Sequence, residues 1–327
     1  MMRIMLTGGA GFVAPHLTAA LRAALGDFAF LPTAQTTARI AGIGSVEALD
    51  VTDATAVDQL VGAFRPTHFI HLAGISALSA AAVDPNLAWE INVLGTLNCA
   101  RSVLKHAPGA SFVFASSSQV YGNRPGPGGL FHETDLLEPT SEYGATKAAA
   151  DLALGMLAMQ GLRSVRLRLF NHTGPGQAET FVVPDFAAQI ARIERGAQAP
   201  VIKVGNLEAK RDFLDVRDVA EAYVSTVRLS DALSSGAVLN ICSGRPVSVG
   251  ALLLQLLALA HVKIAVEIDP ARWRENDIPV LGGDNARARA LLDWTARRDI
   301  AATLADILDA QRELASAASS VTPGGEP

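Results

Sequence analysis

The sequence is poor in cysteine, and this excludes several classes of protein. Among 327 residues there are only two cysteines, Cys99 and Cys242, far apart and with no CxxC spacing. Two such residues build neither a disulfide framework nor a cysteine-ligated metal centre. We therefore predict two buried thiols in a reducing compartment and no metal site.

The chain also lacks runs of basic residues and long apolar segments. Its 27 Lys and Arg residues stand against 32 Asp and Glu residues, and the net charge of −5 argues against nucleic-acid binding. The most apolar segment, residues 247–262, is short and contains Gln255 and His261, which indicates a packed helix and no membrane span. The first residues enter a strand and a glycine-rich turn, leaving no room for a signal peptide. We expect a soluble cytoplasmic protein.

What the sequence does contain is an alternation of strand and helix patterns. Half of the residues are hydrophobic and 18% are charged, which suits a large buried core. Apolar runs bounded by turn residues alternate with segments of helical period through about two thirds of the chain, as a parallel α/β sheet requires. Strands are predicted at residues 3–7, 28–31, 46–49, 68–72, 111–115 and 164–169, and helices at 12–25, 86–106 and 142–160.

After residue 171 the pattern becomes mixed and its elements shorter. The tail from Ala315 is small and polar, so we predict a flexible segment at 316–327. Helices are predicted at residues 181–195, 219–229 and 249–259, and strands at 201–204 and 238–241.

A glycine-rich turn follows the first predicted strand. The segment Thr7-Gly8-Gly9-Ala10-Gly11-Phe12-Val13-Ala14 opens a helix, where glycines let backbone N–H groups approach a pyrophosphate. Tight strand-to-helix turns in general favour glycine, but this position in a strand–turn–helix favours a dinucleotide. We predict cofactor contacts from Gly8, Gly11, Phe12 and Val13.

Other candidate cofactor contacts follow the later strands. Asp50 and Val51 could contact an adenine, although Asp50 could equally cap a helix. No acid follows the second predicted strand and Arg39 is near, which favours NADP(H) over NAD(H), unless Arg39 is only a solvated loop charge. The small residues of Leu72-Ala73-Gly74 would leave room along the cofactor.

Tyr143 and Lys147 stand four residues apart and fall on one helix face. An ammonium close to the phenol would pull the tyrosine pKa from about 10 towards neutrality. Such a tyrosine can exchange a proton with a sugar or alcohol oxygen, and Ser117 would hold the same oxygen. The spacing alone occurs on many solvated helices, so its meaning depends on the glycine turn.

Together the motifs TGGAGF, HLAG, SSSQVYG and YGATK resemble extended short-chain dehydrogenase/reductases of the NAD-dependent epimerase/dehydratase family, which act on nucleotide sugars. The resemblance extends to about Arg297. It implies a Rossmann-type doubly wound parallel sheet, mainly residues 1–170, and a smaller mixed α/β C-terminal lobe, mainly 171–315, with the chain crossing back around 206–242. It also implies that Ser117, Tyr143 and Lys147 are catalytic, that Asn92 and Phe170 lie at the cofactor, and that the protein is a homodimer.

The C-terminal half is similar to the GDP-mannose branch of that family. The matching segments are 170–177, 210–218 and 272–277. Forked guanidinium donors suit a diphosphate and a carboxylate suits a ribose diol. The simpler alternatives are that Arg211 pairs with Asp215, that Arg274 is solvated and that Asn171 only forms a turn. The expected substrate contacts are Ser117, Gln119, Asn171, Val182, Arg211, Arg274 and Asp277.

Gln119 bears on the reaction. In sister 4,6-dehydratases a glutamate stands at this position and drives loss of water from the sugar, and an amide cannot exchange that proton. The resemblance therefore implies reduction of a GDP-linked 4-keto-6-deoxy sugar by NAD(P)H. The alternatives are a 4-epimerase with tightly bound NAD, a reductase that forms the 6-deoxy-talose product, and a non-catalytic NAD(P)-sensing protein. For Gln119 itself the simpler alternative is a polar loop residue with no part in the choice of reaction.

Overall fold

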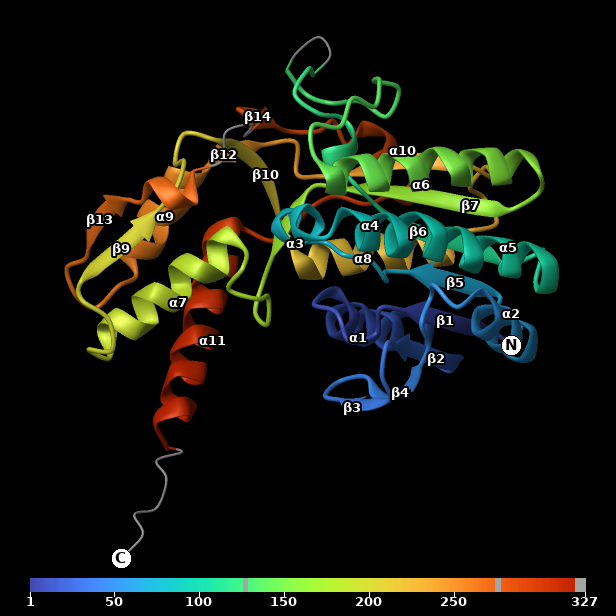
Figure 1. Ribbon diagram of the computed structural model, residues 1–327, viewed down its shortest axis with the longest axis horizontal. Coiled ribbons are helices and arrows are strands. Elements are labelled where there is room, and N and C mark those ends of the chain that lie inside the picture. The colour runs from blue at the N-terminus through green and yellow to red at the C-terminus, as the bar shows by residue number, and fades with distance from the viewer. Residues whose placement is uncertain (126–128, 274–277, 321–327) are drawn as a thin grey trace, which may run out of the picture.

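The central element of the computed structural model is an eight-stranded sheet in the order β11-β7-β6-β5-β1-β2-β4-β3 (Figure 1). The structure describes residues 1–125, 129–273 and 278–320. The strands pair in parallel, except that β3 runs antiparallel to β4. They are β1 (Arg3–Thr7), β2 (Ala29–Ala34), β3 (Ala38–Ile40), β4 (Gly44–Ala48), β5 (His68–His71), β6 (Ser111–Ser117), β7 (Arg163–Leu169) and β11 (Ala237–Ile241).

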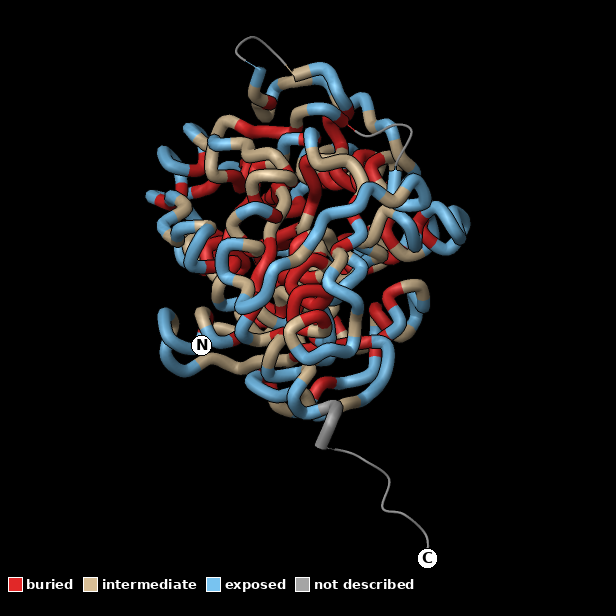
Figure 2. The backbone as a smooth tube through the Cα atoms, turned by 90° about the vertical axis from the view of Figure 1, so that its left-hand side faces the viewer, coloured by how far each residue is buried: buried red, intermediate tan, exposed pale blue. Residues whose placement is uncertain are grey.

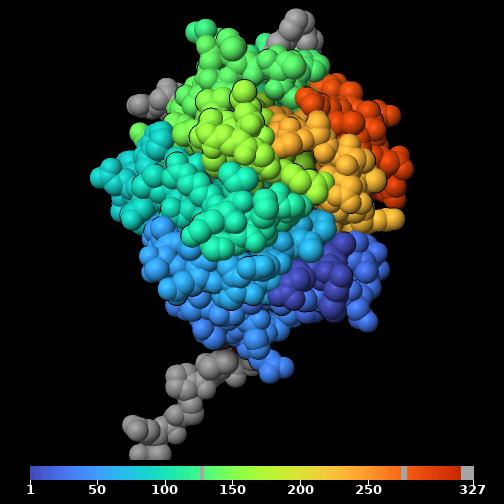
Figure 3. Space-filling view, turned by 90° about the vertical axis from the view of Figure 1, so that its right-hand side faces the viewer, coloured from blue at the N-terminus to red at the C-terminus, as the bar shows by residue number. Residues whose placement is uncertain are grey.

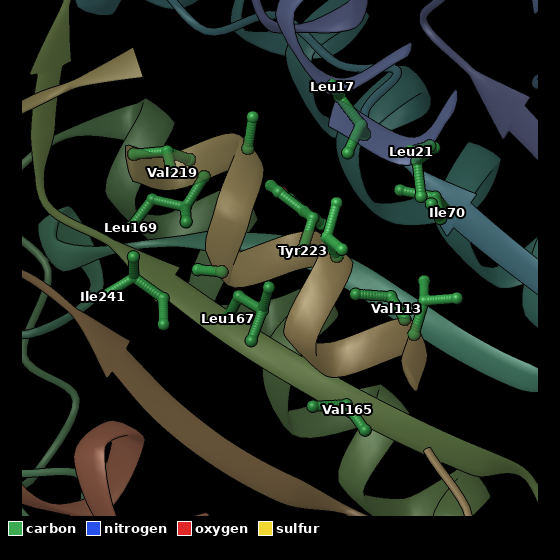
Figure 4. Close-up of a cluster of buried hydrophobic side chains, with 14 of the residues drawn as sticks. Leu17, Leu21, Ile70, Val113, Val165, Leu167, Leu169, Val219, Tyr223 and Ile241 are labelled. Carbon is green, nitrogen blue, oxygen red and sulfur yellow. The ribbon is translucent and has the colours of Figure 1, made fainter. Parts of the chain in front are cut away.

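Alternating side chains of these strands feed two hydrophobic cores, one on each face of the sheet. Ile4 and Leu6 of β1 join the core under α1 and α8, whereas Met5 joins the core under α2, α5 and α6. Figure 4 shows the first core, where Tyr223 of α8 and Leu17 of α1 face the strands. This doubly wound arrangement confirms the predicted Rossmann-type fold.

Helices cover both faces of the sheet. The predicted helix at residues 86–106 is interrupted, because Glu90–Gly95 form a π-helical turn (η1) between two α-helices. α8 begins before the predicted residue 219 because Asp215 caps it, accepting from the Arg217 N–H at 2.7 Å. The helices are α1 (Val13–Leu25), α2 (Ala54–Phe64), α3 (Leu78–Val83), α4 (Pro85–Trp89), α5 (Thr96–His106), α6 (Glu142–Met159), α8 (Val216–Arg228) and α10 (Ala286–Leu292).

A smaller lobe lies beyond the carboxyl ends of the central strands (Figure 1). β10 pairs with β8, β12 and β14, and β9 pairs with β13. Three helices pack around a core of their own. The lobe contains β8 (Asn171–Thr173), α7 (Val182–Glu194), β9 (Val201–Val204), β10 (Lys210–Asp215), β12 (Pro246–Ser248), α9 (Val249–Ala258), β13 (Ala265–Ile268), β14 (Val280–Leu281) and α11 (Ile300–Ser320).

The chain passes between the two parts more than once. After β10 the chain returns to the central sheet as α8 and β11. In Figure 3 these later segments, in orange, lie beside the blue to green segments of the first half of the chain. Buried residues run through the middle of the molecule in Figure 2. The described residues contain no helix that is both long and apolar enough to cross a membrane.

α11 differs from the prediction of a flexible segment that starts at residue 316. The helix continues to Ser320, because its alanine-rich sequence favours helix. Leu304, Ile307 and Leu308 anchor its first half in the core of the lobe. Residues 321–327 lie outside the described chain.

Candidate active site

The glycine turn at the carboxyl end of β1 forms a close-packed cradle at the start of α1. Gly8 has φ +74°, and a Cβ atom there would lie 2.7 Å from the Ala73 nitrogen, so only glycine fits. A Cβ at Gly9 would lie 3.2 Å from the Thr33 oxygen. In the described chain no side chain caps the first turn of α1, which leaves its N-terminus suited to an anion. The turn therefore fits the diphosphate of a dinucleotide.

His71, the first residue of the HLAG motif, joins the end of β1 beside this cradle to α5, a role that the sequence did not predict. The Thr96 hydroxyl donates to the Asn92 carbonyl at 2.7 Å and so accepts from His71 Nε2 at 3.0 Å. His71 Nδ1 then accepts from the Thr7 hydroxyl at 2.7 Å. Burial, and secondarily the charge of Lys147, lower the pKa of His71 to about 3. The ring is therefore neutral at physiological pH, and its two nitrogens link Thr7 to Thr96.

Asn92 holds the loop after β5 through all of its side-chain amide groups. Its Oδ1 accepts from the Ile75 N–H at 2.8 Å, and its Nδ2 donates to the Ile75 carbonyl at 3.2 Å and the Thr146 hydroxyl at 3.0 Å. Asn92 lies in the π-helical turn and bonds both the loop and α6, and such turns often accompany functional sites. Asn92 thus holds Gly74 beside Lys147, and its contact to the cofactor stays a prediction.

Ser117, Tyr143 and Lys147 meet where β6 ends and α6 begins. The Ser141 hydroxyl caps α6 by accepting from the Gly144 N–H at 3.1 Å. Ser117 hydrogen-bonds the Tyr143 hydroxyl, and Lys147 Nζ donates to the Ala115 carbonyl at 2.9 Å. The three side chains that the sequence singles out therefore share one site; their catalytic roles stay a prediction.

The electrostatics of this site differ from the expectation for Tyr143. Burial raises the pKa of Tyr143, and the hydrogen bond from Ser117 offsets this only in part. Burial lowers the pKa of Lys147 to about 8. The ammonium bonds a backbone carbonyl and lies 4.9 Å from the centre of the Phe114 ring. The expectation that Lys147 draws the tyrosine pKa towards neutrality is wrong for this structure, because desolvation dominates.

Gln119 lies in the short η2 turn (Ser118–Val120) directly after Ser117. Its N–H donates to Ser117 Oγ at 3.2 Å. A Cβ at Gly144 would lie only 2.5 Å from the Gln119 carbonyl oxygen, so glycine lets this turn pack against α6 beside Tyr143. The structure thus brings Gln119 to the same site.

The remaining candidate cofactor residues are spread more widely. Asp50 does not cap a helix: it accepts from the N–H and hydroxyl of Thr52, and Asp53 caps α2. Val51 is buried against Gly95 of the π-helical turn. Arg39 is exposed on β3, which β4 separates from β2. The uncharged residues 35–37 follow β2 directly.

The proposed substrate segment packs directly on the cofactor turn. The Phe12 ring stacks on His172, with centroids 6.2 Å apart and planes 7° apart, and meets His16 edge-on at 5.6 Å. His16 Nε2 lies 3.2 Å from the Pro175 carbonyl oxygen. Phe170 is buried in a neighbouring cluster, and Asn171 opens β8.

Of the candidate substrate contacts in the smaller lobe, some lie within the described residues and some do not. The guanidinium of Arg211 donates to the backbone carbonyls of Lys210 and Ile278, while Asp215 binds Arg217, so the suspected Arg211–Asp215 pair does not form. Val182 begins α7 and is partly buried. Arg274 and Asp277 lie outside the described residues.

Comparison with known proteins accords with this geometry. Residues 4–242 match the model of the NAD dependent epimerase/dehydratase family. The chain is 34% identical over 309 residues to GDP-6-deoxy-D-mannose reductase of Pseudomonas aeruginosa, covering 93% of this chain and 96% of that one. The structure of RMD from Pseudomonas aeruginosa complexed with NADPH superposes with a TM-score of 0.84 at 31% identity, covering 96% and 100%. UDP-glucose 4-epimerase of Thermus thermophilus with NAD gives 0.82 at 26%, covering 95% and 99%.

Proposed function

The chain belongs to the NAD dependent epimerase/dehydratase family, and we propose that within it this protein reduces the C4 keto group of GDP-4-dehydro-6-deoxy-D-mannose to give GDP-D-rhamnose. The observation that carries this proposal is the position of Gln119, whose backbone packs against α6 next to Tyr143. By the family resemblance, an eliminating enzyme has an acid at this position, where this chain has an amide. The similarity to a GDP-6-deoxy-D-mannose reductase supports the choice of sugar nucleotide.

The residues of the site fit a proton transfer to a sugar oxygen. A nicotinamide cofactor, when bound, supplies the hydride for C4. Tyr143 donates the proton to the forming alkoxide at O4, and Ser117 donates a hydrogen bond to the same oxygen. Lys147 would hold the nicotinamide ribose. Gly8 and Gly11 would hold the diphosphate at the start of α1.

NADP(H) is the cofactor that we propose, with NAD(H) as the alternative. The segment after β2 carries no acid that would repel a 2′-phosphate, and Arg39 follows it. A related structure contains NADPH and others contain NAD. Titration of the protein with both cofactors decides between them: we expect a lower Kd for NADPH.

A coupled assay tests the reaction. A dehydratase makes the GDP-linked keto sugar in situ, and NADPH absorbance reports its reduction. We expect one NADPH to be consumed for each product formed. A dTDP-linked keto sugar should be reduced more slowly than the GDP-linked one. Tyr143→Phe should lower kcat about 100-fold or more with little change in KM, because only the proton donor is lost. A folded wild type that leaves NADPH unconsumed would contradict the proposal.

The second candidate is a nucleotide-sugar 4-epimerase, favoured by the structural similarity to an epimerase with NAD. An epimerase retains its NAD through purification and interconverts sugars without added cofactor, whereas a reductase consumes NADPH. Product analysis in the same assay also distinguishes GDP-D-rhamnose from GDP-6-deoxy-D-talose, because the two differ in the face of C4 that receives the hydride.

Exposed apolar side chains on adjacent helices support a homodimer. Leu152, Met156 and Met159 lie along α6, and Leu87 and Leu94 lie on the neighbouring α4 and η1. Large apolar patches of this kind mark interfaces, and two copies would join their helix pairs into a four-helix bundle.

The dimer is tested by its mass in solution. Met156→Glu places a charge in the patch and should shift light-scattering mass from two chains to one. The control is Leu254→Glu on α9, a more exposed apolar position outside the patch, which should stay dimeric. A single-chain mass for the wild type would refute this interface.

A further inference from the structure

Three consecutive residues at the end of β6 are each bonded to one face of α6. Residues 143, 147 and 151 recur every four positions and so share that face. The bonded pairs are Ser117 with Tyr143, the Ala115 carbonyl with Lys147 at 2.9 Å, and Ser116 Oγ with Asp151 Oδ2 at 2.6 Å. Two of these pairs contain the proposed catalytic side chains. The third contains residues that neither the motifs nor the proposed mechanism uses.

Asp151 is the fixed point of this set. Its side chain is fully buried and each of its oxygens accepts two hydrogen bonds. Oδ1 accepts from Arg166 Nη1 and Arg168 Nη2, both at 3.0 Å, while Oδ2 accepts from Arg168 Nε at 3.1 Å and from Ser116. Both arginines belong to β7, so the carboxylate joins α6 to two neighbouring strands. Charge-assisted bonds of this kind define one geometry.

Arg168 extends the connection into the rest of the site. Its Nη1 donates to the Tyr121 hydroxyl at 3.0 Å and the Glu133 carbonyl at 3.1 Å. The Tyr121 hydroxyl in turn donates to Asn240 Oδ1 at 2.6 Å on β11. The η2 turn that carries Gln119 is thereby held from both of its ends, by Ser116 before it and Tyr121 after it.

We propose that Ser116 and Asp151 are positioning residues, which set the place of Ser117 relative to Tyr143 and so the geometry of proton transfer. This inference rests on the proposed function for the identity of the reaction. The Ser116 hydroxyl connects the residue before Ser117 to a carboxylate that three other donors already immobilise. Without that hydroxyl the end of β6 and the η2 turn lose their fixed reference on α6. Catalytic groups need placement within a fraction of an ångström, so a small displacement lowers turnover.

Ser116→Ala is the sharper test, because replacing Asp151 would leave two buried guanidinium groups without their partner. The matched control is Ser111→Ala, at the start of the same strand. Ser111 is equally buried, and within the described residues its hydroxyl has no hydrogen-bond partner. We expect Ser116→Ala to lower kcat about tenfold with KM and the Kd of NADPH within twofold. Ser111→Ala should match the wild type, and Ser116→Thr, which keeps the hydroxyl, should recover most of kcat.

Amide hydrogen exchange gives a readout that needs no turnover. Ser116→Ala should speed exchange in residues 115–121, whereas Ser111→Ala should not. Wild-type exchange and wild-type kcat in Ser116→Ala would overturn the positioning role, as would equal losses in kcat and NADPH affinity. If the wild type consumed no NADPH with the GDP-linked keto sugar, the proposed function would fail, and exchange would still decide whether Ser116 positions this segment.

Discussion

Gly74→Ala is the perturbation whose outcome the structure determines most directly. A Cβ at Gly74 would lie 2.8 Å from Asn92 Oδ1 and 3.4 Å from Lys147 Nζ. Asn92 cannot turn away, because its amide bonds Ile75 and Thr146 at the same time. The methyl group therefore pushes the loop after β5 away from Asn92 and from Lys147 on α6.

The loss of stability can be worked out from the hydrogen bonds that the substitution breaks. Losing two hydrogen bonds of the buried Asn92 amide costs about 2 kcal/mol, and the lower entropy of the unfolded alanine variant returns about 0.5 kcal/mol. For 327 residues the unfolding entropy is about 0.7 kcal/mol/K, so the melting temperature should fall by about 2 °C. Displacing the loop from Lys147 should lower kcat/KM about tenfold or more.

Thermal unfolding and the coupled NADPH assay measure both effects. Gly109→Ala is the matched control: the space around its Cβ is open and its backbone is unstrained. That variant should melt at or slightly above the wild-type temperature with unchanged kcat/KM. If Gly74→Ala behaved like Gly109→Ala, Asn92 would not hold the loop, and the account of this corner of the site would be wrong.

Two further predictions concern charge and stacking. Burial lowers the folded-state pKa of Lys147 to about 8 against 10.5 unfolded, so the unfolded chain binds the extra proton between these values and stability rises with pH there. Relative to Lys147→Met, the wild type should gain up to about 3 kcal/mol between pH 8 and 10.5 in urea unfolding, and parallel pH profiles would contradict this. Phe12→Leu removes the stacking of Phe12 on His172, which is worth about 1 kcal/mol. Steady-state kinetics should show a KM for the sugar nucleotide that is raised about fivefold, while the Kd of NADPH changes little. An unchanged KM would show that this stack does not position the substrate segment.

Local sequence signals predict the part of the fold that local physics determines. β1 at Arg3–Thr7 and β9 at Val201–Val204 match their predicted bounds because apolar runs end at glycine or polar turn residues. The glycine turn was recognisable for a similar reason, since Gly8 has a positive φ and no room for a side chain. At such positions the residue type alone predicts the backbone conformation.

Features that depend on distant contacts could not be predicted in this way. The π-helical turn at Glu90–Gly95 keeps a helical hydrophobic period, and Asn92 within it bonds residues 17 and 54 positions away. In the sequence, Asp151 resembles any acidic residue of a helix. Its contacts with Arg168 and Ser116 form only because β6 pairs with β7. Its position four residues after Lys147 was a usable signal.

The pKa of Tyr143 shows why residue spacing alone does not set chemistry. Four residues of separation put Lys147 on the right helix face, yet the ammonium bonds the Ala115 carbonyl and desolvation raises the pKa of the phenol. A tyrosine that stays protonated at neutral pH is ready to donate to an alkoxide, as keto reduction requires. The raised pKa therefore agrees with the donor role that the proposed reduction gives to Tyr143.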